Sequence, residues 1–168
     1  FTGVRSFSRA FRQTLASEAR TLMGADLTVR LFAVATAEQA AALEQLKKRG
    51  VERTLVTETV SMVSSASVEE PLLVSIKAVD PSVYPFYGAV RLAPPGKLAE
   101  KLNDNNVAVS EDLLIRLRVK VGDAVRLGGQ EFRVAGVVVE EPDRMTGSFN
   151  VGPRLMLTRG GLDRTGLI

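Results

Sequence analysis

The chain has 168 residues, 45% of them hydrophobic and 24% charged, which is the composition of an ordinary folded domain with enough length for a core. It contains no cysteine and no histidine, which excludes disulfides, thiol chemistry, Ser–His and Cys–His nucleophile pairs, and the usual zinc, haem and iron–sulfur ligand sets. The net charge of +3 comes from 22 basic and 19 acidic residues that are interspersed, so no nucleic-acid partner is predicted.

The first third of the chain predicts a helix, a strand and a second helix. The first helix, residues 3–23, has apolar residues at helical intervals: Val4, Phe7, Phe11, Leu15 and Leu22. It either packs this stripe on the domain or continues a membrane helix as a stalk, and the stripe alone fits both. Residues 27–31 alternate apolar and polar, which predicts a half-buried strand. Thr36 then begins a helix that reaches Arg49 and ends at Gly50.

The remainder predicts mostly strands with short helices between them. Residues 51–65 and 72–79 form a predicted hairpin with a turn at Glu69–Pro71, so helices and antiparallel strands together indicate an α+β fold. The further expected elements are a short helix at 97–103, a strand at 107–109, a helix at 111–117, a hairpin at 124–140 around Gly128-Gly129, a loop at 143–152, a strand at 155–157 and a helical turn at 161–165.

An aromatic loop follows the second strand of the first hairpin. The strand ends at Asp80-Pro81, and the loop then carries Tyr84, Phe86 and Tyr87. These rings are candidate contacts for a partner, because exposed aromatic residues dominate many interfaces. They could equally fold back on the core of a domain that has few aromatics, or serve a hinge, which would need the same prolines and buried rings.

No catalytic, cofactor-binding or metal-binding residue is predicted. Gly128-Gly129 lacks the strand and helix that flank a phosphate loop, so it is interpreted as a hairpin turn. Residues 103–106 lack the alternating oxygen ligands of a calcium loop. The acidic residues give no reason for two carboxylates to converge, and enzyme activity is therefore not expected.

Several short motifs follow one another along the chain: GADL at 24–27, TVSM at 59–62, KAVD at 77–80, YPFYG at 84–88, VSEDLL at 109–114, VGD at 121–123, FRVAGV at 132–137, EPDR at 141–144 and GPR at 152–154. Together they resemble the MacB-like periplasmic core domain of FtsX-like ABC transporter permeases, over essentially the whole chain. Within that group the sequence is most similar to the YbbP-type permeases, chiefly through the KAVD, YPFYG and EPDR segments.

The resemblance implies a two-lobed α+β domain on the periplasmic side of the inner membrane, between two transmembrane helices of a permease. The membrane-proximal, mixed α/β lobe would comprise residues 1–79 and 151–168, and the β-rich distal lobe residues 80–150. Helix 3–23 would then be a stalk. No cofactor is implied, and the fragment would be part of a longer protein.

The resemblance also implies partners and a role. The partners are the flanking transmembrane helices, a cytoplasmic ATPase that acts indirectly, and a lipid, a lipoprotein or a periplasmic protein. The expected function is noncatalytic mechanotransmission, in which movement driven by ATP reaches an extracytoplasmic partner. The alternative is a module that binds a hydrophobic ligand or lipid between the lobes. A hydrolase is a third possibility, against which the absence of histidine, cysteine and paired carboxylates argues.

Overall fold

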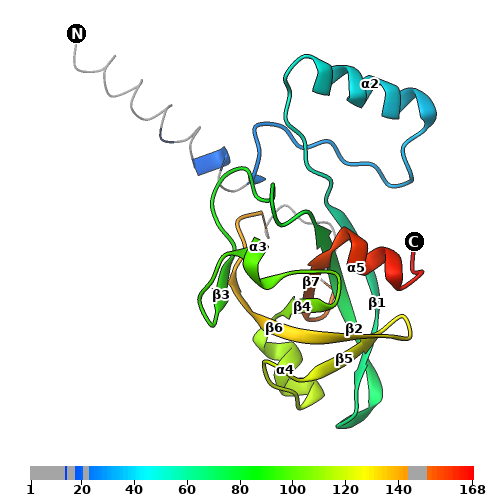
Figure 1. The fold of residues 1–168 in the computed structure, drawn as a ribbon, viewed down its shortest axis with the longest axis vertical. Helices are drawn as coiled ribbons and strands as arrows, with labels where there is room; N and C mark the ends of the chain where they lie inside the picture. The colour runs from blue at the N-terminus through cyan, green and yellow to red at the C-terminus, as the bar shows by residue number, and fades with distance from the viewer. Residues whose placement is uncertain (1–13, 15–17, 21–22, 144–150) are drawn as a thin grey trace.

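A closed β-barrel forms the body of the protein (Figure 1). The structure is a computed structural model, which describes residues 14, 18–20, 23–143 and 151–168. Its elements in chain order are α2 (Ala37–Lys48), β1 (Thr57–Ser65), β2 (Val68–Val79), β3 (Arg91–Ala93), α3 (Leu98–Lys101), β4 (Asn106–Val109), α4 (Glu111–Leu117), β5 (Ala124–Leu127), β6 (Gln130–Glu140), β7 (Arg154–Thr158) and α5 (Arg159–Arg164).

The sheet has the strand order β3-β6-β4-β7-β2-β1-β5, and β5 also pairs with β6. Six strands therefore close on themselves, and β3 extends the sheet from the far half of β6. Pairing is antiparallel except for β2 with β7 and β4 with β6. Each strand of the six-stranded ring therefore has a neighbour on both sides along part of its length, although β1 and β5 pair only at Val63 and Ser64.

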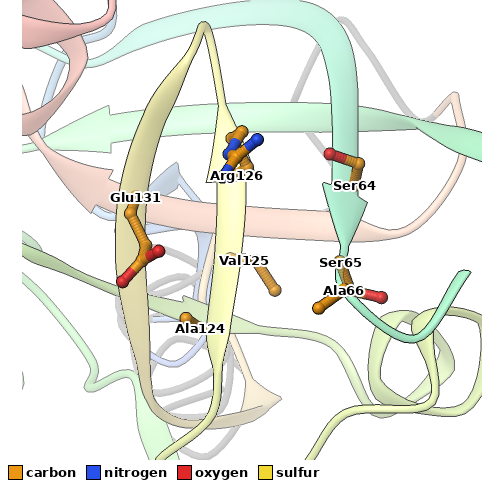
Figure 2. Close-up of a pocket in the computed structure, with 7 residues that line it drawn as sticks. All are labelled: Ser64, Ser65, Ala66, Ala124, Val125, Arg126 and Glu131. Carbon is orange, nitrogen blue, oxygen red and sulfur yellow. The ribbon is translucent and has the colours of Figure 1, made fainter. Parts of the chain in front are cut away.

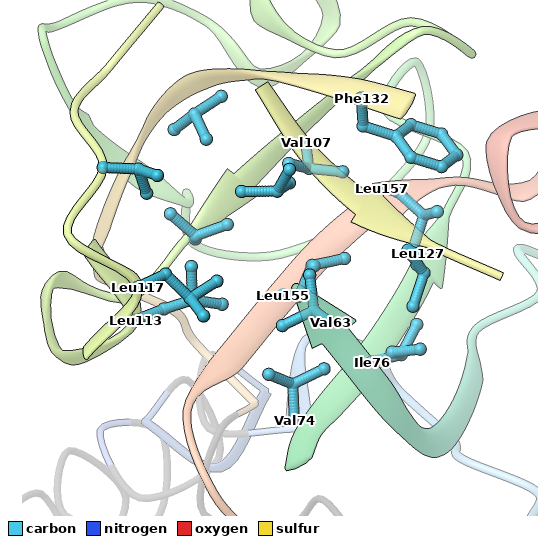
Figure 3. Packing of buried hydrophobic residues seen from close by; sticks show 14 of the residues in the cluster. Val63, Val74, Ile76, Val107, Leu113, Leu117, Leu127, Phe132, Leu155 and Leu157 are labelled. Atoms are coloured by element: carbon cyan, nitrogen blue, oxygen red, sulfur yellow. The ribbon is translucent and has the colours of Figure 1, made fainter. Parts of the chain in front are cut away.

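The barrel interior holds the main core (Figure 3). Val63, Ile76, Leu127, Phe132 and Leu155 come from five different strands and are all 0–1% exposed. Leu113 and Leu117 of α4 also point into this core, so the short helix covers one part of the barrel. A second, smaller cluster lies on the other side of the sheet and includes Val79 and Met156.

The α+β class is confirmed, and most of the short elements lie where the sequence predicts them. The α2 helix begins after Thr36, whose hydroxyl accepts from the N–H of Gln39 in a complete capping box. The α4 helix has the predicted bounds, and β5 and β6 form the expected hairpin. In the structure β2 and β4 both pair with β7, and the division of the chain into two lobes at Val79 stays a prediction. Which end of the domain is nearer a membrane stays a prediction.

Two predicted elements are wrong, and part of a third lies outside the described residues. Residues 27–31 form no strand, because no second strand lies beside them to complete a ladder. The predicted turn at Glu69–Pro71 lies inside β2, and the chain instead turns at Ala66-Ser67. Pro71 is tolerated because β2 pairs with β7 only from Ser75 onward, which leaves one side of the strand free of a ladder there.

The helix predicted at 3–23 is described only at residues 14, 18–20 and 23, which are helical. Most of the expected 143–152 loop also falls outside the described residues. Among the described helices, none combines the length and the apolar character needed to cross a bilayer.

Candidate functional site: a buried ion cluster and the loop above it

Charged side chains are buried on the outer face of the barrel at β2 and β7. Along β2, Ile76 and Ala78 point into the barrel core, so the intervening Lys77 points to the opposite face. Lys77 is only 1% exposed, although it lies in the middle of an apolar strand. Arg154, at the start of the neighbouring strand β7, is 3% exposed on the same side. Two cations are thus removed from water on adjacent strands.

The Lys77 ammonium is fully engaged. Its Nζ donates to the Tyr84 hydroxyl at 2.8 Å, to Glu141 Oε1 at 2.6 Å and to Asp143 Oδ1 at 2.6 Å. These three bonds use all three donors of the ammonium group. The Tyr84 hydroxyl donates in turn to Asp143. The segment after β6 and the loop after β2 therefore meet at one nitrogen.

Arg154 extends the cluster toward β1. Its Nε lies 3.3 Å from Glu141 Oε2, and one terminal nitrogen lies 3.7 Å from Glu58 Oε1. Neither contact has hydrogen-bond geometry, so the guanidinium is held by charge and not by directed bonds. Glu141 bridges the two cations, with one oxygen toward each. We refer to Glu58, Lys77, Tyr84, Glu141, Asp143 and Arg154 as the ion cluster.

Burial and charge also fix the protonation of Tyr84. Its burial, followed by the negative charge of Asp143 and the hydrogen bond to that carboxylate, raises the pKa of Tyr84 far above its ordinary value near 10. The phenol therefore stays neutral and remains a donor. Because every partner in such a network compensates the desolvation of another, removing one member is costly.

The loop of residues 80–88, called the clamp loop below, also contacts the segment that precedes residue 27. The N–H groups of Phe86 and Tyr87 donate to the carbonyl oxygen of Gly24 at 3.1 and 3.3 Å. The Tyr87 hydroxyl donates to Asp26 at 2.8 Å, and this hydrogen bond is the main reason that the pKa of Tyr87 is raised. Arg20 pairs with Asp26 at 2.9 Å and lies 5.7 Å from the centre of the Tyr87 ring.

The start of the clamp loop is held by its own side chains. Asp80 accepts from the hydroxyl of Ser82 at 2.6 Å and from the N–H of Ser82 at 3.0 Å. These two bonds lower the pKa of Asp80, the hydroxyl contributing more. The loop is thus tied at three places: to itself at Asp80, to the ion cluster at Tyr84 and to the N-terminal segment at Tyr87.

The three aromatic residues predicted as partner contacts have different environments. Tyr84 is 5% exposed and its hydroxyl is bonded inside the ion cluster, so its ring is not on the surface. The expectation that Tyr84 contacts a partner is corrected for this reason. Phe86 and Tyr87 are half-buried, and their role as partner contacts stays a prediction.

Sequence reasoning missed the ion cluster itself. One signal was available, because Lys77 interrupts an apolar run that otherwise belongs inside a sheet. A lysine in such a position is rarely buried unless it is paired. Its acidic partners, 64 and 66 positions further along the chain, could not be identified without the fold.

A hollow of about 290 Å³ lies where β1 and β5 separate (Figure 2). Apart from Val125, its lining residues are small or polar: Ser64, Ser65, Ala66, Ala124, Arg126 and Glu131. None of them belongs to the ion cluster. Among the described residues, no group of three or more acidic side chains is arranged to hold a metal ion.

The sequence was compared with known protein families, relatives and solved structures. Residues 1–165 match the family described as MacB-like periplasmic core domain. One relative is a protein of Escherichia coli (strain K12) described as an uncharacterized ABC transporter permease YbbP. The two sequences are 34% identical over 128 residues, which is 75% of this chain and 15% of the relative. The crystal structure of the periplasmic region of MacB from Actinobacillus actinomycetemcomitans superposes with a TM-score of 0.48 at 15% identity, covering 73% of this chain and 56% of that one. The chain therefore belongs to the MacB-like periplasmic core domain family.

Proposed function

We propose that this domain relays motion, driven by ATP hydrolysis elsewhere in the transporter, to a partner outside the membrane. The observation that carries the proposal is the clamp loop, which joins the N-terminal segment at Gly24 to the barrel at Lys77. A relay needs this connection, because force applied to the N-terminal segment has to move the barrel instead of bending the link between them.

The contacts on both sides of the loop suit a stiff link. At one end, Tyr84 is held by two bonds inside a dry cluster where electrostatic interactions are stronger than in water. At the other end, two backbone bonds and the Tyr87–Asp26 bond act together on one short stretch. Closed barrels resist deformation because every strand in the ring has two neighbours. Movement of Gly24 and Asp26 would therefore carry the barrel with it.

The partners that this role requires are also proposed. They are the flanking transmembrane helices, the cytoplasmic ATPase that acts indirectly, and a lipid, lipoprotein or periplasmic protein that receives the motion. We place the receiving contact near Phe86 and Tyr87, because each keeps part of its ring accessible beside the link. Binding there would couple a partner to the same loop that holds the N-terminal segment.

The hollow between β1 and β5 does not favour the alternative of a lipid-binding module. Sites for apolar ligands are lined mainly by large hydrophobic and aromatic side chains. This hollow instead presents serine, alanine, arginine and glutamate side chains around one valine. The relay remains the function that the described contacts support best.

The proposal can be tested on the complete permease with its ATPase in lipid nanodiscs. An environment-sensitive fluorophore on Lys120→Cys, an exposed site on the barrel, reports movement when ATP is added. The double substitution Asp26→Ala and Tyr87→Ala weakens the link to the N-terminal segment by removing its side-chain hydrogen bond. Asp112→Ala with Arg116→Ala removes a surface ion pair on α4 and is the matched control.

We expect ATP hydrolysis to persist in both variants, and the ATP-dependent fluorescence change to be lost only in the link variant. A link variant that hydrolyses ATP and still shows the full fluorescence change would overturn the relay.

A further inference from the structure

The hollow between β1 and β5 marks a place where two neighbouring strands of the barrel part. The two strands pair at only two positions, the second being Ser64 with Arg126. The hydroxyl of the next residue, Ser65, donates to the carbonyl oxygen of Leu117, the last residue of α4, at 2.8 Å. This bond fixes the end of β1 beside α4, and the hollow of about 290 Å³ opens where β1 has left β5.

The first residue of β5, Ala124, turns its backbone groups toward this opening. Ala124 lies opposite Arg133 in the ladder of β5 with β6. The N–H of Arg133 donates to the carbonyl oxygen of Asn105 at 3.0 Å and therefore points away from β5. The pair thus exchanges no hydrogen bonds, and the N–H and C=O of Ala124 point away from β6, toward the side of β1. Within the described part of the chain, no strand pairs with Ala124 on that side.

The chain around the hollow is rich in basic side chains. Residues 118–133 hold two acidic side chains and four basic ones, Arg118, Lys120, Arg126 and Arg133. All four basic residues are exposed, and none of them forms an ion pair with another described residue. The neighbouring Arg116, by contrast, pairs with Asp112 at 3.0 Å. Arg126 lies opposite Glu131 in the ladder, but Figure 2 shows the two side chains directed apart.

The alternation along β5 places the charges and the open backbone on one surface. Val125 and Leu127 are 1% and 0% exposed in the barrel core, so Ala124 and Arg126 point outward. Arg133, opposite Ala124, lies on the same outer face. Because alanine carries only a methyl group, the long side chain of Arg133 has room to extend over it toward the hollow.

We propose that this hollow binds an extended, acidic segment of another protein, which adds to β5 as a short strand. The N–H and C=O of Ala124 would pair with the backbone of the segment, as an open strand edge does with a peptide. Its alternate side chains would lie on the outer face beside Arg126, and acidic ones would pair with the arginines there. The lining of the hollow shares no residue with the clamp loop, and the proposal holds whether or not the domain relays motion.

A peptide fits this mixture of groups better than a free anion or a lipid phosphate. The lining offers donors at Arg126 and at the N–H of Ala124, and it also offers acceptors at the C=O of Ala124 and the carboxylate of Glu131. A phosphate group would satisfy the donors and would be repelled by the acceptors. An extended acidic peptide supplies N–H groups for the acceptors and carboxylates for the arginines, so it satisfies both sets.

The test measures the binding of a fluorescein-labelled peptide, in which glutamate alternates with threonine, to the complete permease in phosphatidylcholine nanodiscs by fluorescence anisotropy. We expect Arg126→Glu to weaken binding at least about tenfold, because repulsion replaces a charge-assisted pair. Lys97→Glu makes the same charge change at an exposed position that does not line the hollow, and it should leave binding unchanged. A peptide with lysine in place of glutamate should not bind.

Ala124→Pro tests the backbone contact separately. It removes an N–H that points away from β6, so the ladder of β5 with β6 keeps its hydrogen bonds and the permease should unfold at nearly the same temperature. Binding of the glutamate peptide should nevertheless fall at least about tenfold, because one of its acceptors loses its donor.

Absence of binding to the unchanged permease, or binding that survives Arg126→Glu, would overturn the proposal. Displacement of the peptide at constant ionic strength by inorganic phosphate would assign the hollow to an anion, and displacement by phosphatidylglycerol vesicles would assign it to a lipid. Pairing of two permeases that Arg126→Glu abolishes would assign it to a second copy. Each of these three results would also overturn the proposal.

Discussion

The barrel and the stretch of residues 25–56 differ in what holds them together. In the barrel, each strand of the ring has two neighbours, and the core residues are almost fully removed from water. In the stretch, α2 is specified by its cap and its charges, and none of its residues is buried. Local sequence signals are thus sufficient to define a helix, whereas burial requires a partner surface, which among the described residues the barrel provides.

The ion cluster lies at the border between these two regions. It sits on the outer face of the barrel and holds the clamp loop, which in turn reaches Gly24. On this side the charges add to the smaller hydrophobic cluster, which also includes Tyr84 of the clamp loop. The comparison leads to the following predictions, which begin with the largest expected effect.

Lys77→Met removes the central cation and keeps a side chain of similar length. Glu141 and Asp143 would then be buried without their main partner, and we expect a loss of about 3–5 kcal/mol in the free energy of unfolding. Urea denaturation followed by circular dichroism measures it. Lys120→Met, at an exposed position, should change stability by less than about 0.5 kcal/mol. Equal effects of the two substitutions would show that the ion cluster contributes nothing to the free energy of unfolding.

Leu113→Ala and Leu46→Ala compare the two regions directly. Leu113 is 0% exposed in the barrel core, and its truncation should cost about 2–5 kcal/mol through lost burial and a cavity. Leu46, on α2, is 44% exposed, and its truncation in this chain should cost less than about 0.5 kcal/mol. A large effect at Leu46 in urea denaturation of the isolated chain would mean that α2 packs on the barrel after all.

Gly152→Ala tests the close approach of the segment before β7 to the backbone of β2. Gly152 has a φ of +76°, and a Cβ there would overlap the carbonyl oxygen of Leu73. Gly129 has nearly the same φ, +75°, with open space around it. Alanine at Gly129 should cost about 1–2 kcal/mol from the backbone conformation alone. Alanine at Gly152 should cost more in thermal or urea unfolding, and equal costs would contradict the contact.

The smallest effect concerns alkaline pH. The pKa of Tyr84 is raised in the folded chain, so the unfolded chain releases this proton first, and stability should fall as the pH rises above about 10. Both tyrosines of the chain, Tyr84 and Tyr87, lie in the clamp loop, and Tyr87→Phe leaves Tyr84 as the only chromophore of its kind. We expect tyrosinate absorbance in that variant to appear only together with unfolding. Reversible ionisation near pH 10 in a folded protein would contradict the burial of Tyr84.

The sequence predicted the elements whose signals are local. Thr36 begins one helix, and Ser110 followed by the acidic Glu111 and Asp112 begins another. Gly128-Gly129 turns a hairpin, because caps and turns depend on a few adjacent residues. The strand predicted at 27–31 failed because a strand also needs a neighbour, which alternation alone does not supply. The prediction of a turn at Pro71 was wrong because β2 pairs with β7 only from Ser75 onward, so a proline can lie within the first part of β2.

The candidate site was predicted only in part. The clamp loop was recognised from its rings and prolines, but the ion cluster was not, because it joins residues far apart in the chain. Lys77 meets Glu141 only through the pairing order of the barrel, which places the end of β6 above β2 and β7. Sequence patterns indicate which faces are buried, and they do not indicate which buried charges meet.

The central claim is that the clamp loop makes the N-terminal segment and the barrel one rigid unit. Spin labels on Glu18→Cys and Lys120→Cys report on it directly, because both sites are exposed and the chain has no cysteine of its own. Their distance distribution should be measured by pulsed electron paramagnetic resonance in the complete transporter, without nucleotide and with ATP trapped. The account predicts one narrow distribution that is the same in both states. A distribution that shifts or broadens when ATP binds would contradict it.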